Sequence, residues 1–143
     1  MKKRNIPGTA LTVSGICMGT AEMGSFFDKE QSFRMLDAFC NAGGNFIDTA
    51  HVYSNWVPGE KSRSEKMIGK WLKERQMYGK VVVATKGAHP ELESMNVPRM
   101  SKDEIQMDLE ESLQYLGLDC IDLYWLHRDD PSRPAGEILE SLN

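Results

Sequence analysis

Short apolar segments alternate four times with segments of helical periodicity along this 143-residue chain. The expected strands lie at residues 11–19 (LTVSGICMG), 45–48 (NFID), 80–86 (KVVVATK) and 120–127 (CIDLYWLH). Strands that alternate with helices and are apolar on both faces indicate a parallel sheet covered by helices. We therefore expect an α/β protein, built either as an open doubly wound sheet or as a barrel.

Capping residues and glycines predict where the helices begin and end. Ser62 is followed three residues later by Glu65, and Ser101 by Glu104, which is the spacing of a capping box. The expected bounds are Asp28 to Gly43–Gly44 for the first helix, Ser62 to Gly79 for the second, Ser101 to Gly117 for the third, and a start near Pro134 for the fourth.

The loops that leave the strands are longer than those that enter them. Helices connect to the next strand through GGN, YGK and GLD, whereas TAEMGSFF, TAHVYSNWVPGEK, GAHPELESMNVPRM and RDDPS follow the strands. In α/β proteins the carboxyl ends of the strands form the functional face. The glycine-rich turn of a dinucleotide-binding open sheet is absent after the first strand, because Gly43–Gly44 follows a helix.

Composition excludes several classes of function. The net charge is −4 and basic residues are mixed with acidic ones, which argues against nucleic-acid binding. The amino-terminal segment lacks the uninterrupted apolar core of a signal peptide, and no membrane association is expected. Cys17, Cys40 and Cys120 are odd in number and widely spaced, so we expect reduced and mostly buried thiols in a cytoplasmic protein.

Three consecutive strands end on an ionisable residue. The second strand ends on Asp48, the third on Lys86 and the fourth on His127, and Tyr53 follows Asp48 by five residues. Any one of them could be an ordinary solvated loop residue. Alternation along the strands places all three on one face, together with Phe46, Val82, Ala84, Leu123 and Trp125. Their convergence favours a functional site.

The segments GNFIDTAHVYS, VVVATKG and IDLYWLHRDD resemble the corresponding segments of the aldo-keto reductase family, in the same order along the chain. The resemblance implies a (β/α)8 TIM-type barrel, of which this chain supplies about the first four units as one incomplete domain, residues 1–143. It also implies reduction of an aldehyde or ketone with a nicotinamide cofactor, usually NADP.

The resemblance assigns a role to each residue of the set. Tyr53 would donate the proton, Lys86 would adjust the acidity of that phenol, Asp48 would pair with the lysine, and His127 would orient the substrate carbonyl. Gly19 and Thr20 would contact the cofactor, together with Asp48.

The chemistry of carbonyl reduction requires such a set. Hydride addition to a carbonyl carbon leaves an alkoxide, and a free phenol with a pKa of roughly 10 donates its proton reluctantly. A neighbouring ammonium stabilises the phenolate, and a carboxylate keeps that ammonium charged. A histidine that donates to the carbonyl oxygen adds orientation and electrostatic stabilisation.

Other polar and aromatic residues are weaker candidates. His51 and His89 lie in the long loops, where a solvated side chain is expected, and no metal-ligand spacing is present. Trp56 could form a wall of the substrate pocket or only cover the rim of a barrel.

Two other functions stay open. Lys86 could form a Schiff base with a ketone in an aldolase-like lyase. The chain could also be a non-catalytic regulatory subunit that binds the cofactor. A complete barrel takes ~250 residues and often binds phosphate through loops after its seventh and eighth strands. We therefore expect the 143-residue chain alone to bind cofactor weakly, to turn over poorly, and to self-associate through the inner face of its half barrel.

Overall fold

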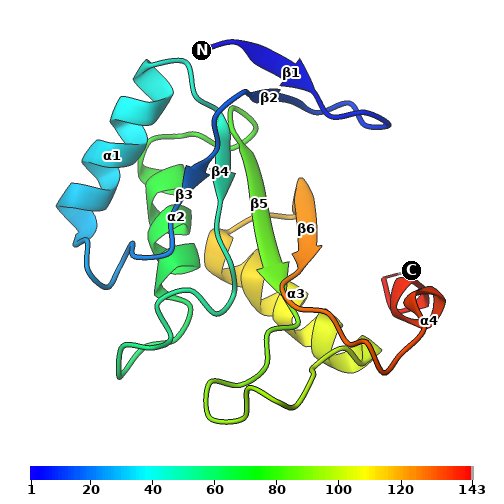
Figure 1. The fold of residues 1–143 in the computed structure, drawn as a ribbon. Coiled ribbons are helices and arrows are strands. Elements are labelled where there is room, and N and C mark those ends of the chain that lie inside the picture. The colour runs from blue at the N-terminus through cyan, green and yellow to red at the C-terminus, as the bar shows by residue number, and fades with distance from the viewer. Residues whose placement is uncertain (143) are drawn as a thin grey trace.

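A computed structural model describes residues 1–142, which form a parallel sheet covered by helices on one face (Figure 1). The sheet has four strands in the order β3-β4-β5-β6. Its strands are β3 (Met18–Gly19), β4 (Phe46–Asp48), β5 (Val82–Gly87) and β6 (Leu123–Leu126). The helices are α1 (Lys29–Asn41), α2 (Arg63–Glu74), α3 (Lys102–Leu116) and α4 (Ala135–Glu140). This is the strand-helix alternation that the sequence predicts.

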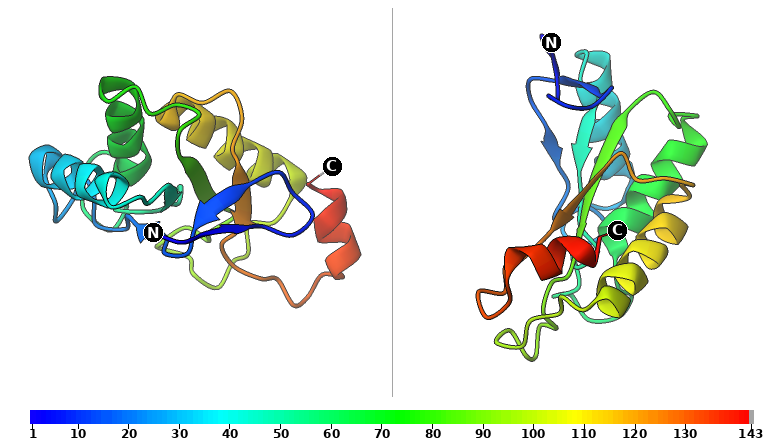
Figure 2. Two further views of the ribbon diagram at one scale, coloured as in Figure 1. Left: turned by 90° about the horizontal axis from the view of Figure 1, so that it is seen from above. Right: turned by 90° about the vertical axis from the view of Figure 1, so that its right-hand side faces the viewer.

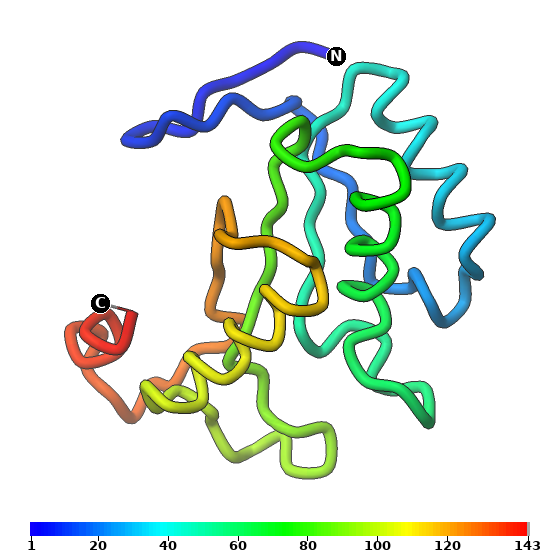
Figure 3. The backbone as a smooth tube through the Cα atoms, turned by 180° about the vertical axis from the view of Figure 1, so that it is seen from behind, coloured from blue at the N-terminus to red at the C-terminus, as the bar shows by residue number. Residues whose placement is uncertain are grey.

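Helices α1, α2 and α3 lie together on one side of the sheet, as the view from behind and the view from above show (Figures 2 and 3). The main core lies between these helices and the strands. It is formed by Met23, Phe33, Leu36, Ile47, Ile68, Trp71, Leu72, Val81, Val83 and Leu116. Helix α4 lies beyond β6, and its Ile138 packs with Ile105 of α3, Ala88 and Met100 in a second, smaller core (Figure 1). The opposite face of the sheet is left without a covering helix in residues 1–142 (Figure 2).

The expected first strand, residues 11–19, is two separate strands. Residues Thr12–Ser14 form β2, which pairs antiparallel with β1 (Lys3–Asn5) in an amino-terminal hairpin. The chain then turns and joins the sheet at β3. Asn45 explains the separation, because its side chain accepts from the Ser14 N–H and donates to the Thr12 carbonyl, which fixes the hairpin at the start of β4.

The predicted helix starts are confirmed at Asp28, Ser62, Ser101 and Pro134. Asp28 and Ser101 each accept a hydrogen bond from the backbone N–H three residues on, and the capping box is complete in both cases. The box predicted for Ser62 and Glu65 is wrong. Ser62 has a left-handed backbone conformation with no side-chain cap, and its hydroxyl donates to the His51 carbonyl instead.

The second helix also ends earlier than predicted. It stops at Glu74, and not near Gly79, because Arg75 caps it and Gln76 has a positive φ of 52°. No helix within residues 1–142 is both long enough and apolar enough to cross a membrane.

Candidate active site

The strand register brings the three ionisable strand ends together on the bare face of the sheet. Asp48 pairs with Ala84 on β5, and Lys86, two residues further, pairs with Trp125 on β6. His127 continues the same ladder, because its N–H donates to the Gly87 carbonyl at 2.9 Å. Steps of two residues keep side chains on one face. The predicted convergence of these side chains is therefore present.

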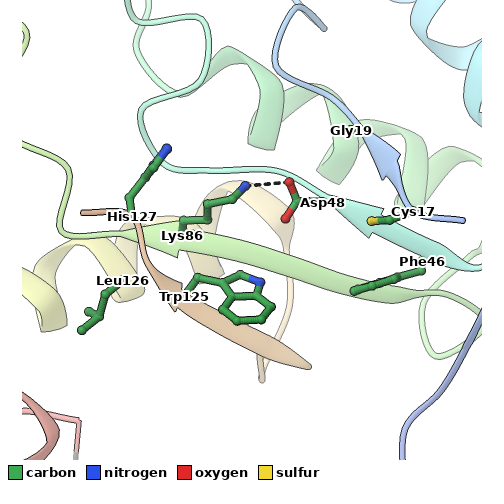
Figure 4. A pocket seen from close by; sticks show the side chains of 8 residues that line it. All are labelled: Cys17, Gly19, Phe46, Asp48, Lys86, Trp125, Leu126 and His127. Atoms are coloured by element: carbon green, nitrogen blue, oxygen red, sulfur yellow. Dashed lines mark hydrogen bonds and ion pairs between the residues drawn. The ribbon is translucent and has the colours of Figure 1, made fainter. Parts of the chain in front are cut away.

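Lys86 is the centre of the site (Figure 4). Its Nζ donates to Asp48 Oδ2 at 2.7 Å, to the Thr49 carbonyl at 2.7 Å and to Tyr53 Oη at 3.0 Å. An ammonium has three N–H groups, so all of them are used. The side chain is 16% exposed, which limits the other positions and water contacts that the ammonium can reach. The lysine is held in one position, charged, between a carboxylate and a phenol.

His127 completes the set beside Tyr53, with the two ring centroids 5.7 Å apart. Burial lowers the pKa of His127 to about 4, and the neighbouring His89, Lys86 and Arg128 add to the decrease. The imidazole is therefore neutral at pH 7. Its Nδ1 is buried and has no hydrogen-bond partner among residues 1–142, so Nε2 is the nitrogen through which it can bind a ligand.

An open cavity of about 630 Å³ lies over these side chains on the bare face. It is lined by Cys17, Gly19, Phe46, Asp48, Lys86, Trp125, Leu126 and His127 (Figure 4). A Cβ added to Gly19 would meet no atom within 4 Å, so the protein itself does not need a glycine for packing there. Gly19 thus leaves open space at this end of the cavity.

Thr20, the other predicted cofactor contact, is buried, and its hydroxyl forms hydrogen bonds within the protein. Its side chain is 1% exposed, and its hydroxyl bonds to the Asp48 carbonyl and to Ser64 Oγ, both at 2.9 Å. Ser64 also bonds to Thr49 Oγ1 at 2.9 Å. These buried hydroxyls fix the backbone that carries Asp48 and Thr49. No sequence pattern marks Ser64 for this role, because it lies on α2, outside the strand ends.

Two histidines that were expected to be solvated are packed. His51 Nε2 lies 2.6 Å from Glu111 Oε2 on α3, and the His51 side chain is 14% exposed. The His89 ring lies edge-on to His127, with centroids 4.8 Å apart. The prediction for both residues is wrong, because helix α3 and strand β6 approach the loops after β4 and β5. Trp56 is 46% exposed, and its ring lies edge-on to that of Tyr53 at 6.4 Å.

The cysteines are free, as predicted, but they are not mostly buried. Cys17 and Cys120 are exposed and Cys40 is partly exposed. Cys17 follows a break in the expected first strand and lies at the bare face of the sheet. Among the residues that the structure describes, no group of three or more His, Cys, Asp or Glu side chains is arranged to hold a metal ion.

Comparison with known proteins places this arrangement in context. Residues 15–143 match the sequence profile of the Aldo/keto reductase family. Norsolorinic acid reductase A of Aspergillus parasiticus is 31% identical over 96% of this chain and 37% of its own length. The aryl-alcohol dehydrogenase (NADP+) of Phanerodontia chrysosporium is 34% identical over 96% of this chain and 38% of its own length.

The fold is similar to that of a solved structure, an aldo-keto reductase from Bacillus halodurans in its holo form. The TM-score is 0.79 at 30% sequence identity, over 99% of this chain and 45% of that one. The chain thus spans 37% to 45% of the length of these three proteins.

Proposed function

Because the chain belongs to the aldo/keto reductase family, we propose that it reduces the carbonyl group of an aldehyde or ketone to an alcohol with a nicotinamide cofactor. It supplies part of the family's (β/α)8 barrel, with the carboxyl ends of four parallel strands forming the site. The single observation that carries the proposal is the Lys86 ammonium bound at once to Asp48 and Tyr53.

The hydrogen bond from Lys86 determines the direction in which the hydroxyl hydrogen of Tyr53 points. An ammonium offers donors only, so Nζ donates to Tyr53 Oη and the hydroxyl hydrogen cannot point back at Nζ. That hydrogen is free to face a substrate oxygen. When the proton leaves, the negative charge forms on an oxygen 3.0 Å from a fixed positive charge. Lys86 therefore stabilises the phenolate, and Asp48 keeps Lys86 charged.

His127 orients the carbonyl as a neutral donor. Its lowered pKa keeps the ring uncharged at neutral pH. A proton on Nδ1 would be a buried donor without a partner, so the tautomer with the proton on Nε2 is favoured. Nε2 then donates to the substrate oxygen while Tyr53 protonates it. Both donors meet the oxygen on which charge develops.

The cofactor site lies in the cavity over the sheet. When bound there, a reduced nicotinamide supplies the hydride that the carbonyl carbon accepts. Gly19 would leave room for the ring beside β3, and Asp48 would lie at its edge. NADPH is proposed over NADH, because a relative carries NADP+ in its name.

An aromatic carbonyl compound is the proposed substrate class. Two relatives are named for an aryl alcohol and for norsolorinic acid. In this chain Trp56 and Trp125 are 46% and 47% exposed, and they flank the Tyr53 and Lys86 side chains. Their faces could pack against an aromatic ring. Trp56 is accordingly proposed as a wall of the substrate pocket.

The proposal is tested in a version of this protein that carries a complete barrel, by the oxidation of NADPH with benzaldehyde, followed by absorbance, with NADH measured in parallel. Turnover with NADPH that is lost in Tyr53→Phe supports it. Binding of NADPH without turnover of any aromatic aldehyde would indicate the regulatory subunit instead.

The Schiff-base alternative has its own test. A lysine must lose its proton to attack a ketone, whereas Lys86 Nζ donates three hydrogen bonds, one of them to the Asp48 carboxylate. Borohydride reduction in the presence of a ketone, followed by mass spectrometry, should leave Lys86 unmodified. A stable adduct on Lys86 would favour the lyase.

A further inference from the structure

Asp108 on helix α3 holds the loop that follows β5. The side chain is 1% exposed, and its Oδ2 accepts from the Ala88 N–H at 2.8 Å. Both carboxylate oxygens also accept from Arg99, with Nη2 at 2.9 Å from Oδ1 and Nη1 at 3.2 Å from Oδ2. Arg99 Nη1 donates in addition to the His89 carbonyl at 3.0 Å. One buried carboxylate thus fixes both ends of the loop.

The backbone held by Asp108 has an unfavourable conformation. Ala88 is fully buried and has a φ of 59°, which L-residues other than glycine rarely adopt. Such a conformation persists where the surroundings determine it. Gly87 is packed so closely against Asp108 and Tyr124 that an added Cβ would collide with both side chains. The segment Gly87–His89 is therefore held in one conformation by contacts from α3 and β6.

This segment contacts His127 in two places. The Gly87 carbonyl accepts from the His127 N–H at 2.9 Å. The His89 ring lies edge-on to the His127 ring, with centroids 4.8 Å apart and planes at 69°. The His89 Nδ1 donates to the Pro90 carbonyl at 2.7 Å, which fixes the His89 ring. Both the backbone and the imidazole of His127 rest on the segment that Asp108 holds.

We propose that Asp108 is a positioning residue for His127, acting through Arg99 and the segment Gly87–His89. This inference rests on the proposed role of His127 in carbonyl reduction. Asp108 lies behind the sheet, on a helix, and does not line the cavity over the site. Asp108 therefore affects the substrate indirectly, because it sets the position and the solvation of the His127 imidazole.

The pKa of His127 depends directly on the position of its ring and on its access to water. The ionisable groups that face its ring are His89 from the loop after β5, Lys86 from β5, Tyr53 from the loop after β4, and Arg128 next in the chain. Burial is the main cause of its lowered pKa. If the loop is released, water reaches the ring and the pKa returns toward its ordinary value of about 6.5.

The experiment is a histidine NMR titration of the 143-residue chain, which contains three histidines, with the His127 signal assigned by His127→Gln. In the wild type, His127 should not titrate above about pH 5. In Asp108→Asn, its titration should move upward by about one pH unit or more. Glu110→Gln removes an exposed carboxylate from the same helix and should leave the titration unchanged. Equal titrations in all three proteins would overturn the proposal.

A second variant covers the case in which Asp108→Asn does not fold. Arg99→Gln keeps the Asp108 bond to Ala88 but removes the bond to the His89 carbonyl, and it should raise the His127 titration as well. Arg99→Lys keeps the charge and should restore part of the wild-type behaviour. A folded Arg99→Gln chain with wild-type titration contradicts the inference.

Kinetics separate positioning from a merely structural role. In Asp108→Asn of a version that carries a complete barrel, kcat/KM for the carbonyl substrate should fall about tenfold or more, with the Kd of NADPH unchanged. A moved titration with unchanged kcat/KM would show that Asp108 does not act on the reaction. Because the titration needs no turnover, failure of the proposed function would leave that part of the result intact.

Discussion

The Lys86 Nζ lies 2.7 Å from Asp48 Oδ2, although the two residues are on different strands and 38 positions apart in the sequence. The pair is partly buried, with side-chain exposures of 16% and 26%. Close opposite charges with little water around them interact more strongly than an exposed ion pair. This ion pair fixes the ammonium against Tyr53.

In a version of this protein that carries a complete barrel, replacing Tyr53 by phenylalanine should remove the proton donor and little else. We expect kcat for carbonyl reduction to fall by roughly 100-fold or more, which is the usual contribution of a general acid. The Kd of NADPH should change little, because the variant loses one hydroxyl group. Steady-state kinetics and a fluorescence titration with cofactor check both parts. Near-wild-type turnover would remove Tyr53 from the mechanism.

Replacing Lys86 by methionine should be comparably damaging. The variant keeps the length of the side chain but removes the charge beside Tyr53 Oη and leaves Asp48 without its partner. In alcohol oxidation, where the phenolate accepts a proton, the pH at which activity rises should move upward, because the phenolate is no longer stabilised. A pH-rate profile of both proteins measures this. Full activity with an unmoved profile would contradict the pairing.

Replacing Ser64 by alanine should weaken the support beneath the site. The Ser64 hydroxyl bonds to Thr20 and Thr49, and all three residues are buried. Leaving buried hydroxyls without a partner costs about 1–3 kcal/mol. We expect a loss of that order in the free energy of unfolding, measured in urea, together with a reduced kcat. Ser94→Ala, at an exposed position of the loop after β5, is the matched control and should have a small effect.

Glu65 should make the stability depend on pH. It is fully buried, and burial raises the pKa of its carboxyl above the ordinary 4.5, although the Thr85 hydroxyl at 2.6 Å opposes the rise. Between 4.5 and the raised value the folded state holds more protons than the unfolded state, so this group destabilises the fold as pH rises.

The variant Glu65→Gln removes that dependence. Glu65 Oε2 and Ser112 Oγ have no hydrogen-bond partner within the described part of the chain, and an amide could donate to the serine. At about pH 7.5 the variant should be more stable than the wild type by on the order of 1 kcal/mol, and the difference should shrink toward pH 4.5. Thermal unfolding at several pH values measures it. A difference that does not vary with pH would show that Glu65 ionises equally in both states.

The bare face of the sheet should cause self-association of the 143-residue chain. Trp125 is 47% exposed there, and β3 and β6 are edge strands within residues 1–142. Val82 and Ala84, which the strand period also predicts on this face, add little to the exposed apolar surface, because they are 8% and 0% exposed, beside larger residues of neighbouring strands. We propose a twofold dimer that covers this face.

Light scattering tests the dimer. Trp125→Lys should shift the mass toward a monomer, while Met107→Lys, at an exposed position of α3, should not. A wild-type chain that stays monomeric at high concentration would refute the association. We also propose that this chain binds NADPH weakly on its own, and tight binding with ordinary turnover would place the cofactor site differently.

The sequence by itself predicted the four strand-helix units and, to within one residue, the ends of β4, β5 and β6. Periodicity and the caps at Asp28 and Ser101 act within a few residues, so local pattern was enough to predict α1 and α3. The convergence of Asp48, Lys86 and His127 followed from the strand period and the parallel order of the strands. Both rest on short-range geometry that a single sequence contains.

Tertiary structure decided the features that depend on distant partners. Ser62 and Glu65 have the spacing of a capping box, but Ser62 bonds to His51 and Glu65 to Thr85, which the fold brings close. His89 looks like a loop residue in sequence, yet Arg99 binds its carbonyl and Asp108 binds Arg99. A buried polar group takes the partner that the packed fold offers, because an unpaired one costs free energy. Only the packing of α2, α3 and β6 against the loops could identify those partners.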